Sequence, residues 1–223
     1  MSEKTECAKC TMPACGSKNP DQGMSNCPTK TKQGVIKQAI TEYNRPDINE
    51  LYRQSCIQTS EVYVNLPEGR TPCRPRVEEV VQLAKKMGYK KLGIAFCSGL
   101  KAETKLLTPI LENRGFDVVS VCCKCGFITK ETIGFKDEQK MSESGTAKLI
   151  CNPISQAEIL NGEGTDFNIV VGLCVGHDSL FLKYAQAPTT VLIVKDRVFG
   201  HNPVAALYQS HSYHRKLLRK ESD

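Results

Sequence analysis

Four of the five apparent strands in the second half of the chain end in cysteine. The four segments are KLGIAFC (91–97), DVVSVCC (117–123), AKLIC (147–151) and FNIVVGLC (167–174), and TTVLIVKD (189–196) is the fifth. Continuous apolar strands of this kind are typical of a sheet that is buried on both faces. Helical patterns alternate with them. The sequence therefore predicts an α/β domain built on a Rossmann-like parallel sheet of about five strands.

The carboxyl ends of parallel strands form the crevice where such sheets bind ligands. Thiols delivered there from separate strands would converge and could bind a metal, and the candidates are Cys97, Cys122, Cys123, Cys125, Cys151 and Cys174. Because side chains alternate along a strand, Cys122 and Cys123 point to opposite faces, and one metal centre would not use both. Buried cysteines can also serve as small hydrophobic residues. Their recurrence at equivalent strand ends favours a shared site.

A second group of thiols opens the chain, with the spacing Cys7-x2-Cys10-x4-Cys15-x11-Cys27 and a proline directly after the last cysteine. Residues 1–30 show no hydrophobic periodicity, so a bound metal is the natural way to order them. The absence of histidine and the Cys-Pro pair favour a [4Fe–4S] cluster. Zinc is the alternative, although structural zinc usually takes two close pairs of ligands. Thiols without metal are the third interpretation.

The chain of 223 residues has room for one α/β domain and an appended module. We expect residues 1–64 to form a cysteine-rich metal-binding segment with two helices, and residues 65–223 to form the Rossmann-like domain. A Pro- and Gly-containing stretch at 65–75 would separate the two parts. Cys56 and Cys73 have no neighbour at a ligand spacing and are interpreted as incidental or buried thiols, although Cys73 could complete a site in space.

The formal charge of +6 counts every thiol as neutral. A cubane held by four thiolates carries a charge of about −2, so two such clusters would offset most of the excess. Without tryptophan or interleaved basic and aromatic residues, the sequence argues against nucleic-acid binding. No apolar stretch follows Met1, and no run approaches the ~20 apolar residues of a membrane span. We therefore expect a cytoplasmic protein, where clustered thiols more often serve metals than disulfides.

His177 and Asp178 follow the strand-end Cys174 at the predicted start of a helix. Both are candidate proton donors beside the crevice, and His177 is also a candidate ligand. A role only as N-terminal helix residues is the alternative.

The opening CAKC…CP, the strands GIAFC and VVSVCCKCG, and the blocks CNPISQAEILN and GLCVGHDSLFLKYAQAPTTVLIVKDRVFGHNPVAALY resemble the domain-of-unknown-function family 1847. The resemblance covers nearly the whole chain. It implies a metal-binding protein of the kind found largely in anaerobic bacteria and archaea, with no assigned reaction. It adds weight to the cysteines in the matching blocks, namely Cys7, Cys10, Cys15, Cys27, Cys97, Cys151 and Cys174.

Three functional hypotheses follow. The first is an iron–sulfur oxidoreductase or sulfur-transfer enzyme with two [4Fe–4S] clusters, in which the N-terminal cluster relays electrons to a crevice cluster that meets a small-molecule substrate. A redox protein such as a ferredoxin would then be the partner. The second is an electron carrier, redox sensor or cluster carrier, which needs the same thiols but no substrate pocket. The third is a zinc-stabilised interaction module.

Overall fold

The computed structural model describes residues 4–11, 14–17, 19–135 and 149–220. The chain divides into two compact units, Met1–Pro72 and Cys73–Asp223. Among the helices in these described ranges, none combines the length and the apolar character that a membrane crossing would require.

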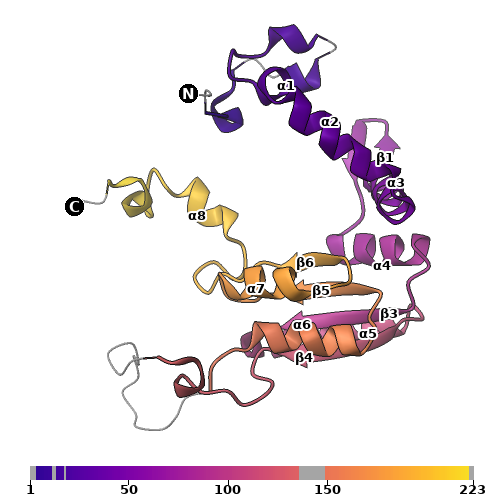
Figure 1. Cartoon of the computed structure of the whole chain (residues 1–223), viewed down its shortest axis with the longest axis vertical. Helices are drawn as coiled ribbons and strands as arrows, with labels where there is room; N and C mark the ends of the chain where they lie inside the picture. The colour runs from indigo at the N-terminus through magenta and orange to yellow at the C-terminus, as the bar shows by residue number, and fades with distance from the viewer. Residues whose placement is uncertain (1–3, 12–13, 18, 136–148, 221–223) are drawn as a thin grey trace. The chain divides into compact units, whose positions relative to one another are not determined.

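The first unit starts with short turns of 3-10 helix and continues into helices and a two-stranded hairpin (Figure 1). The turns include Cys7–Lys9, Ala14–Gly16 and Pro20–Gln22. The helices are α1 (Pro28–Thr31), α2 (Gln33–Thr41) and α3 (Pro46–Glu61), and the hairpin strands are β1 (Tyr63–Leu66) and β2 (Gly69–Pro72). Proline opens both α1 and α3, at the position where its missing N–H costs nothing.

The hairpin occupies much of the stretch that the sequence predicted as a break at 65–75. Tyr63 pairs with Pro72 and Leu66 with Gly69 in antiparallel register. Gly69 adopts a φ of 130°, which a side chain would oppose, and this lets the chain reverse within two residues. The division between the units accordingly falls after Pro72, whereas the sequence analysis placed it after residue 64.

The second unit is built on a parallel sheet in the order β4-β3-β5-β6 (Figure 1). Its strands are β3 (Lys91–Phe96), β4 (Asp117–Cys122), β5 (Phe167–Val171) and β6 (Thr189–Ile193). The central strands β3 and β5 are almost entirely buried, as their continuous apolar sequences predict. The predicted α/β class with a parallel sheet is confirmed.

The strand predicted at 147–151 is wrong for residues 149–151, and the parallel sheet has four strands in the described residues. Residues 147 and 148 lie outside the described ranges. Leu149 makes only an isolated antiparallel bridge with Thr129. The segment then hydrogen-bonds to the chain that continues beyond β4, where the Asn152 N–H donates to the Cys123 carbonyl at 2.7 Å. Its backbone is therefore satisfied by a loop and not by a neighbouring strand.

Helices connect the strands in two directions. α5 (Lys101–Glu112) links β3 to β4, whereas α6 (Pro153–Gly162) links β4 to β5 and α7 (His177–Tyr184) links β5 to β6. Right-handed crossovers place α5 on one face of the sheet and α6 with α7 on the other, and α6 and α7 pack together. α4 (Arg76–Lys86) precedes the sheet, and α8 (Val204–Tyr208) follows it. The connections diverge between β3 and β5, which makes this the topological switch point where such folds bind ligands.

Candidate metal sites

Cysteines cluster at the carboxyl edge of the sheet, beside the switch point. The backbone ladder continues past the strands, since the Cys97 N–H donates to the Val171 carbonyl at 3.2 Å and the Cys123 N–H to that of Phe96 at 2.9 Å. These bonds hold the two cysteines at the same level of the edge. The ends of β3 and β4 thus place Cys97 and Cys123 side by side.

Cys174 reaches the same edge through a turn after β5. Gly172 has a φ of 65°, and a Cβ added there would lie 2.6 Å from a methyl group of Leu100. Only glycine fits this position, because both the backbone conformation and the packing exclude a side chain. The turn leads through the buried Leu173 to Cys174, which is half-buried.

We refer to Cys97, Cys123, Cys151 and Cys174 as the edge cysteines, or the edge group. Sulfur atoms of this group lie close to one another and to backbone N–H groups. Cys151 and Cys123 are 3.5 Å apart, sulfur to sulfur, and Cys123 also lies within hydrogen-bonding reach of the Cys97 thiol. The Ser98 N–H donates to the Cys123 sulfur at 3.3 Å, and the Gly99 N–H to that of Cys97 at 3.5 Å. Thiols from three separate segments of the chain therefore meet at one place.

Two cations complete this edge, and the sequence analysis missed both. The Lys195 ammonium donates to the Cys97 sulfur, and the Arg197 guanidinium donates to the Cys174 sulfur at 3.3 Å. Lys195 and Arg197 lie two and four residues beyond the end of β6, so the rule that ligands gather at carboxyl strand ends also points to them. Cys97 and Cys174 each lie next to one of these positive charges. A positive environment favours the ionised form of a thiol.

The pKa values of the edge thiols diverge. Burial alone would raise the pKa of Cys97, but the Lys195 ammonium and the Gly99 N–H hold it below its ordinary value. Burial, and then the neighbouring Cys123, raise the pKa of Cys151 to about 12, with a further contribution from Cys174. Burial would lower the pKa of Lys195, but its contact with Cys97 and the charge of Cys174 raise it. The edge thus holds one thiol poised to ionise and another that resists ionisation.

Cys122 and Cys125 lie next to this group but take no part in the sulfur contacts above. Both are half-buried and pack against the core. The Cys125 sulfur is 4.0 Å from the Asn152 carbonyl oxygen. Burial, followed by the charges of Cys122 and Cys123, raises the pKa of Cys125. Of these three cysteines, Cys123 therefore joins the sulfur contacts at the edge, and Cys122 and Cys125 do not.

His177 and Asp178 begin α7, as expected, and their backbone N–H groups donate to the Cys174 carbonyl at 2.9 and 3.1 Å. The Asp178 carboxylate accepts the Ser179 N–H at 2.8 Å. Among the described residues, neither side chain makes a hydrogen bond or ion pair with a cysteine. His201, another histidine near this edge, accepts the Asp196 N–H on its Nδ1 atom at 3.2 Å.

The sulfur contacts among the edge cysteines are made in pairs, and the four residues do not surround one common point. Across the described ranges, no group of three or more histidine, cysteine, aspartate or glutamate side chains is arranged to hold a metal ion. All twelve cysteines fall within those ranges, and none forms a disulfide. The edge therefore offers thiols in reach of one another, each with a hydrogen-bonding partner other than a metal.

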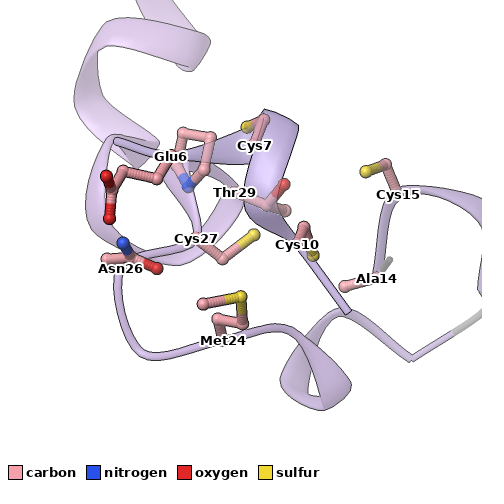
Figure 2. Close-up of a pocket in the computed structure, with 10 residues that line it drawn as sticks. Glu6, Cys7, Cys10, Ala14, Cys15, Met24, Asn26, Cys27 and Thr29 are labelled. Carbon is pink, nitrogen blue, oxygen red and sulfur yellow. The ribbon is translucent and has the colours of Figure 1, made fainter. Parts of the chain in front are cut away.

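The N-terminal cysteines surround a small cavity in the first unit (Figure 2). Its volume is about 150 Å³, and it is lined by Glu6, Cys7, Cys10, Ala14, Cys15, Met24, Asn26, Cys27, Pro28 and Thr29. All four predicted cysteines thus line one space, although they come from three separate turns. Figure 2 shows the sulfur atoms of Cys10, Cys15 and Cys27 around this space.

Local hydrogen bonds shape the N-terminal loop around this cavity. The Lys30 ammonium donates to the carbonyls of Asp21 at 2.8 Å and Gly23 at 2.6 Å, which ties the loop to α1. A Cβ on Gly23 would lie 3.1 Å from the Cys27 sulfur, so a larger residue would crowd the thiol. The Thr29 hydroxyl lowers the pKa of Cys27. The remaining predicted thiols, Cys56 and Cys73, are exposed and belong to neither group.

Comparison with known proteins identifies the family. The family model described as "Protein of unknown function (DUF1847)" matches residues 27–192. The chain belongs to this family. The match confirms the resemblance seen in the sequence, and it spans all the edge cysteines while starting at the last of the N-terminal four. This DUF1847 protein is also 44% identical over 187 residues to an uncharacterized protein of Methanocaldococcus jannaschii, covering 84% of this chain and 90% of that protein.

Two crystal structures of Dph2 from Pyrococcus horikoshii, one of them with a 4Fe-4S cluster, are similar to part of this DUF1847 protein. The identity is 18% in both, and the TM-scores are 0.35 and 0.34. The matches cover 65% of this chain but only 34% and 33% of the Dph2 chains, so the chain spans about a third of their length. A likeness at this level carries no argument about function.

Proposed function

We propose that the protein is an iron–sulfur protein with two metal sites, one at the carboxyl edge of the sheet and one in the N-terminal loop. The observation that carries the proposal is the convergence of thiols at the switch point, with two cations directed at their sulfur atoms. Four thiols are the proposed ligands of the edge site: Cys97, Cys123, Cys151 and Cys174.

The chemistry of the donor set at the edge fits an anionic cluster. A [4Fe–4S] cluster bound by thiolates carries net negative charge, which costs free energy beside buried strands unless it is compensated. Lys195 and Arg197 supply positive charge, and the Ser98 and Gly99 N–H groups supply hydrogen bonds to sulfur. Such hydrogen bonds and nearby charges are the means by which proteins set the reduction potential of a cluster.

The size of the N-terminal cavity favours a cluster over a single ion there. Four sulfur atoms bound to one zinc ion at about 2.3 Å lie only about 3.8 Å from each other and enclose no further space. A cavity of about 150 Å³ is far larger than the 10–15 Å³ or so that one water molecule needs. Cys7, Cys10, Cys15 and Cys27 are the proposed ligands, and the role of this site is electron relay.

With all four thiols bound, a cluster at the edge would supply one-electron transfer. Lewis-acid chemistry would require that only three of them bind, so that one iron keeps an open position. His177 and Asp178 are the proposed proton donors, because α7 places both next to Cys174. A redox protein such as a ferredoxin would deliver electrons in the cytoplasm, and a small molecule would be the substrate of an oxidoreductase or sulfur-transfer reaction. A carrier or sensor without a substrate is the alternative within the same chemistry.

One observation favours zinc as a second candidate at the edge. The 3.5 Å between the sulfur atoms of Cys123 and Cys151 is close to the roughly 3.8 Å expected for two thiolates on one tetrahedral ion. Zinc there would make the second unit a zinc-stabilised module instead of a redox protein.

Metal and sulfide analysis of protein purified without oxygen tests the proposal. Two [4Fe–4S] clusters predict about eight iron atoms and eight sulfides per chain, a broad absorption near about 400 nm and a paramagnetic signal after reduction. Stoichiometric zinc in colourless protein would contradict the iron–sulfur proposal, and about four iron atoms would leave only one of the two sites.

A further inference from the structure

A second thiol motif lies beside the edge group and is left unused by the proposed cluster. Cys122 and Cys125 have the C-x-x-C spacing, which in α/β proteins is typical of redox-active dithiols. Cys122 ends β4, the outer strand in the order β4-β3-β5-β6, and Cys125 lies in the turn that follows. Both thiols are half-buried, so neither is sealed inside the core.

The backbone brings these two cysteines within disulfide range. The Cys125 N–H donates to the Cys122 carbonyl at 3.1 Å and closes a four-residue turn. Such a turn holds its first and fourth Cα atoms within about 7 Å, and disulfides join Cα atoms about 4.4–6.8 Å apart. The turn is also anchored to the next segment, since the Asn152 N–H donates to the Cys123 carbonyl at 2.7 Å. A bond between the two thiols therefore asks for little movement of the backbone.

Cys123, one of the two residues between them along the chain, makes contacts with other partners. Cys123 is 2% exposed, and its sulfur contacts the Ser98 N–H and the Cys151 sulfur. Because side chains alternate at the end of a strand, Cys122 points to the opposite face. One short segment thus presents Cys123 to the edge group, whereas Cys122 and Cys125 lie beside that group without joining its sulfur contacts.

We propose that Cys122 and Cys125 form a redox-active dithiol that reduces small disulfides by thiol–disulfide exchange. This rests on the proposed function in one respect, since it assumes that neither thiol is a cluster ligand. In the first step a thiolate of the pair attacks one sulfur of the substrate R–S–S–R′, forms a mixed disulfide and releases R′S⁻, which takes up a proton. In the second step the other thiolate of the pair attacks the mixed disulfide, closes the Cys122–Cys125 bond and releases RS⁻, which is protonated in turn. Two electrons pass from the protein to the substrate, and a second dithiol restores the reduced pair.

Oxidised glutathione is a suitable probe, applied without oxygen to the full-length, metal-loaded protein. We expect one disulfide between Cys122 and Cys125, about two molecules of reduced glutathione per chain, and unchanged iron content. After alkylation of the remaining thiols, peptide mass spectrometry identifies the linked pair. Cys56, exposed in the first unit, provides the matched control, and C56S should behave as the parent protein.

The variant Cys125→Ser should stop the reaction at the mixed disulfide, with one glutathione held on Cys122. A bond between Cys123 and Cys151, or glutathione on Cys122 of the parent protein without ring closure, would overturn the proposal. The iron count separates this test from that of the proposed function. A Cys122–Cys125 disulfide formed in protein that contains no iron would contradict only the proposed cluster. Full iron loading without that disulfide would contradict only the proposed dithiol.

Discussion

The two thiol groups of this protein are built in opposite ways. The N-terminal cysteines lie within one short stretch of the chain, and the turns that carry them bury almost nothing, with Ala14 as the buried residue among them. The edge cysteines come from distant parts of the chain and are held by buried strands, with Cys97 and Cys123 only 5% and 2% exposed. A local spacing defines the first group, and the topology of a sheet defines the second.

The difference indicates which interactions keep each group of cysteines in place. A segment without a hydrophobic core gains stability from the bonds that its thiols make to a metal. A sheet edge is held in place by its own core and ladder, whether or not a metal is bound. The two groups should therefore respond differently to metal removal, to a core mutation and to a change of local charge.

Metal removal should have the largest effect, and it should be confined to the first group. Chelation without oxygen should raise the rate of proteolytic cleavage within residues 4–31 by an order of magnitude or more, because these turns have almost no buried core and only exposed or half-buried hydrogen bonds to hold them. The second unit should keep its protection, as followed by mass spectrometry of the fragments. Equal loss of protection in both units would show that the sheet also depends on metal.

A core mutation under the edge should act only on the second group. The fully buried Gln156 donates from Nε2 to the carbonyls of Val121 at 2.7 Å and Phe96 at 3.2 Å, and so joins α6 to β3 and β4. Replacing it with leucine removes both bonds, and we expect a loss of about 2 kcal/mol in the free energy of unfolding of the second unit. Urea denaturation measures this.

Gln186→Leu is the matched control, since Gln186 is exposed in the same unit. It should change the free energy of unfolding by no more than about 0.5 kcal/mol. Similar losses in the two glutamine variants would mean that Gln156 does not support the edge. A loss of iron from the N-terminal site in Gln156→Leu would argue against separate construction.

A change of charge at the edge should have the smallest effect. In protein without metal, the rate of Cys97 alkylation should rise with pH around a midpoint below the ordinary thiol value, because Lys195 lowers the pKa. The thiolate is the reactive form, so Lys195→Met should move the midpoint upward, by about one pH unit. Cys151, whose pKa is raised to about 12, should react only at much higher pH.

Lys183→Met is the control for this charge, because Lys183 is exposed on α7. It should leave the midpoint of Cys97 in place. If the Lys195 and Lys183 variants shift it equally, general charge and not the contact with the sulfur sets the pKa.

The sequence predicted the α/β class and the parallel sheet, because continuous apolar segments alternate with helical patterns. The rule that ligands gather at carboxyl strand ends made the edge cysteines candidates for a site. The same rule applied to β6 points to Lys195 and Arg197, which contact sulfur but are not metal ligands, so a pattern of ligand residues does not include them. The sequence could not reveal that Cys151 arrives from a loop beside Cys123. A short apolar run looks the same whether it pairs with a strand or hydrogen-bonds to a turn.

The hairpin β1–β2 was missed for a related reason. Pro67 and Gly69 indicate a turn, and the flanking strands Tyr63–Leu66 and Gly69–Pro72 are too short to show a clear alternation. The choice among Cys122, Cys123 and Cys125 was also beyond the sequence, because it depends on where β4 ends and on the turn that follows.

Iron analysis of two single variants tests the central claim of two separate sites most directly. Cys27→Ser changes only the N-terminal group and Cys174→Ser only the edge group, and each should lose about half of the iron and one of two distinct paramagnetic signals. The double variant should lose both. Complete loss of iron in either single variant, or an unchanged iron content in Cys174→Ser, would contradict the account.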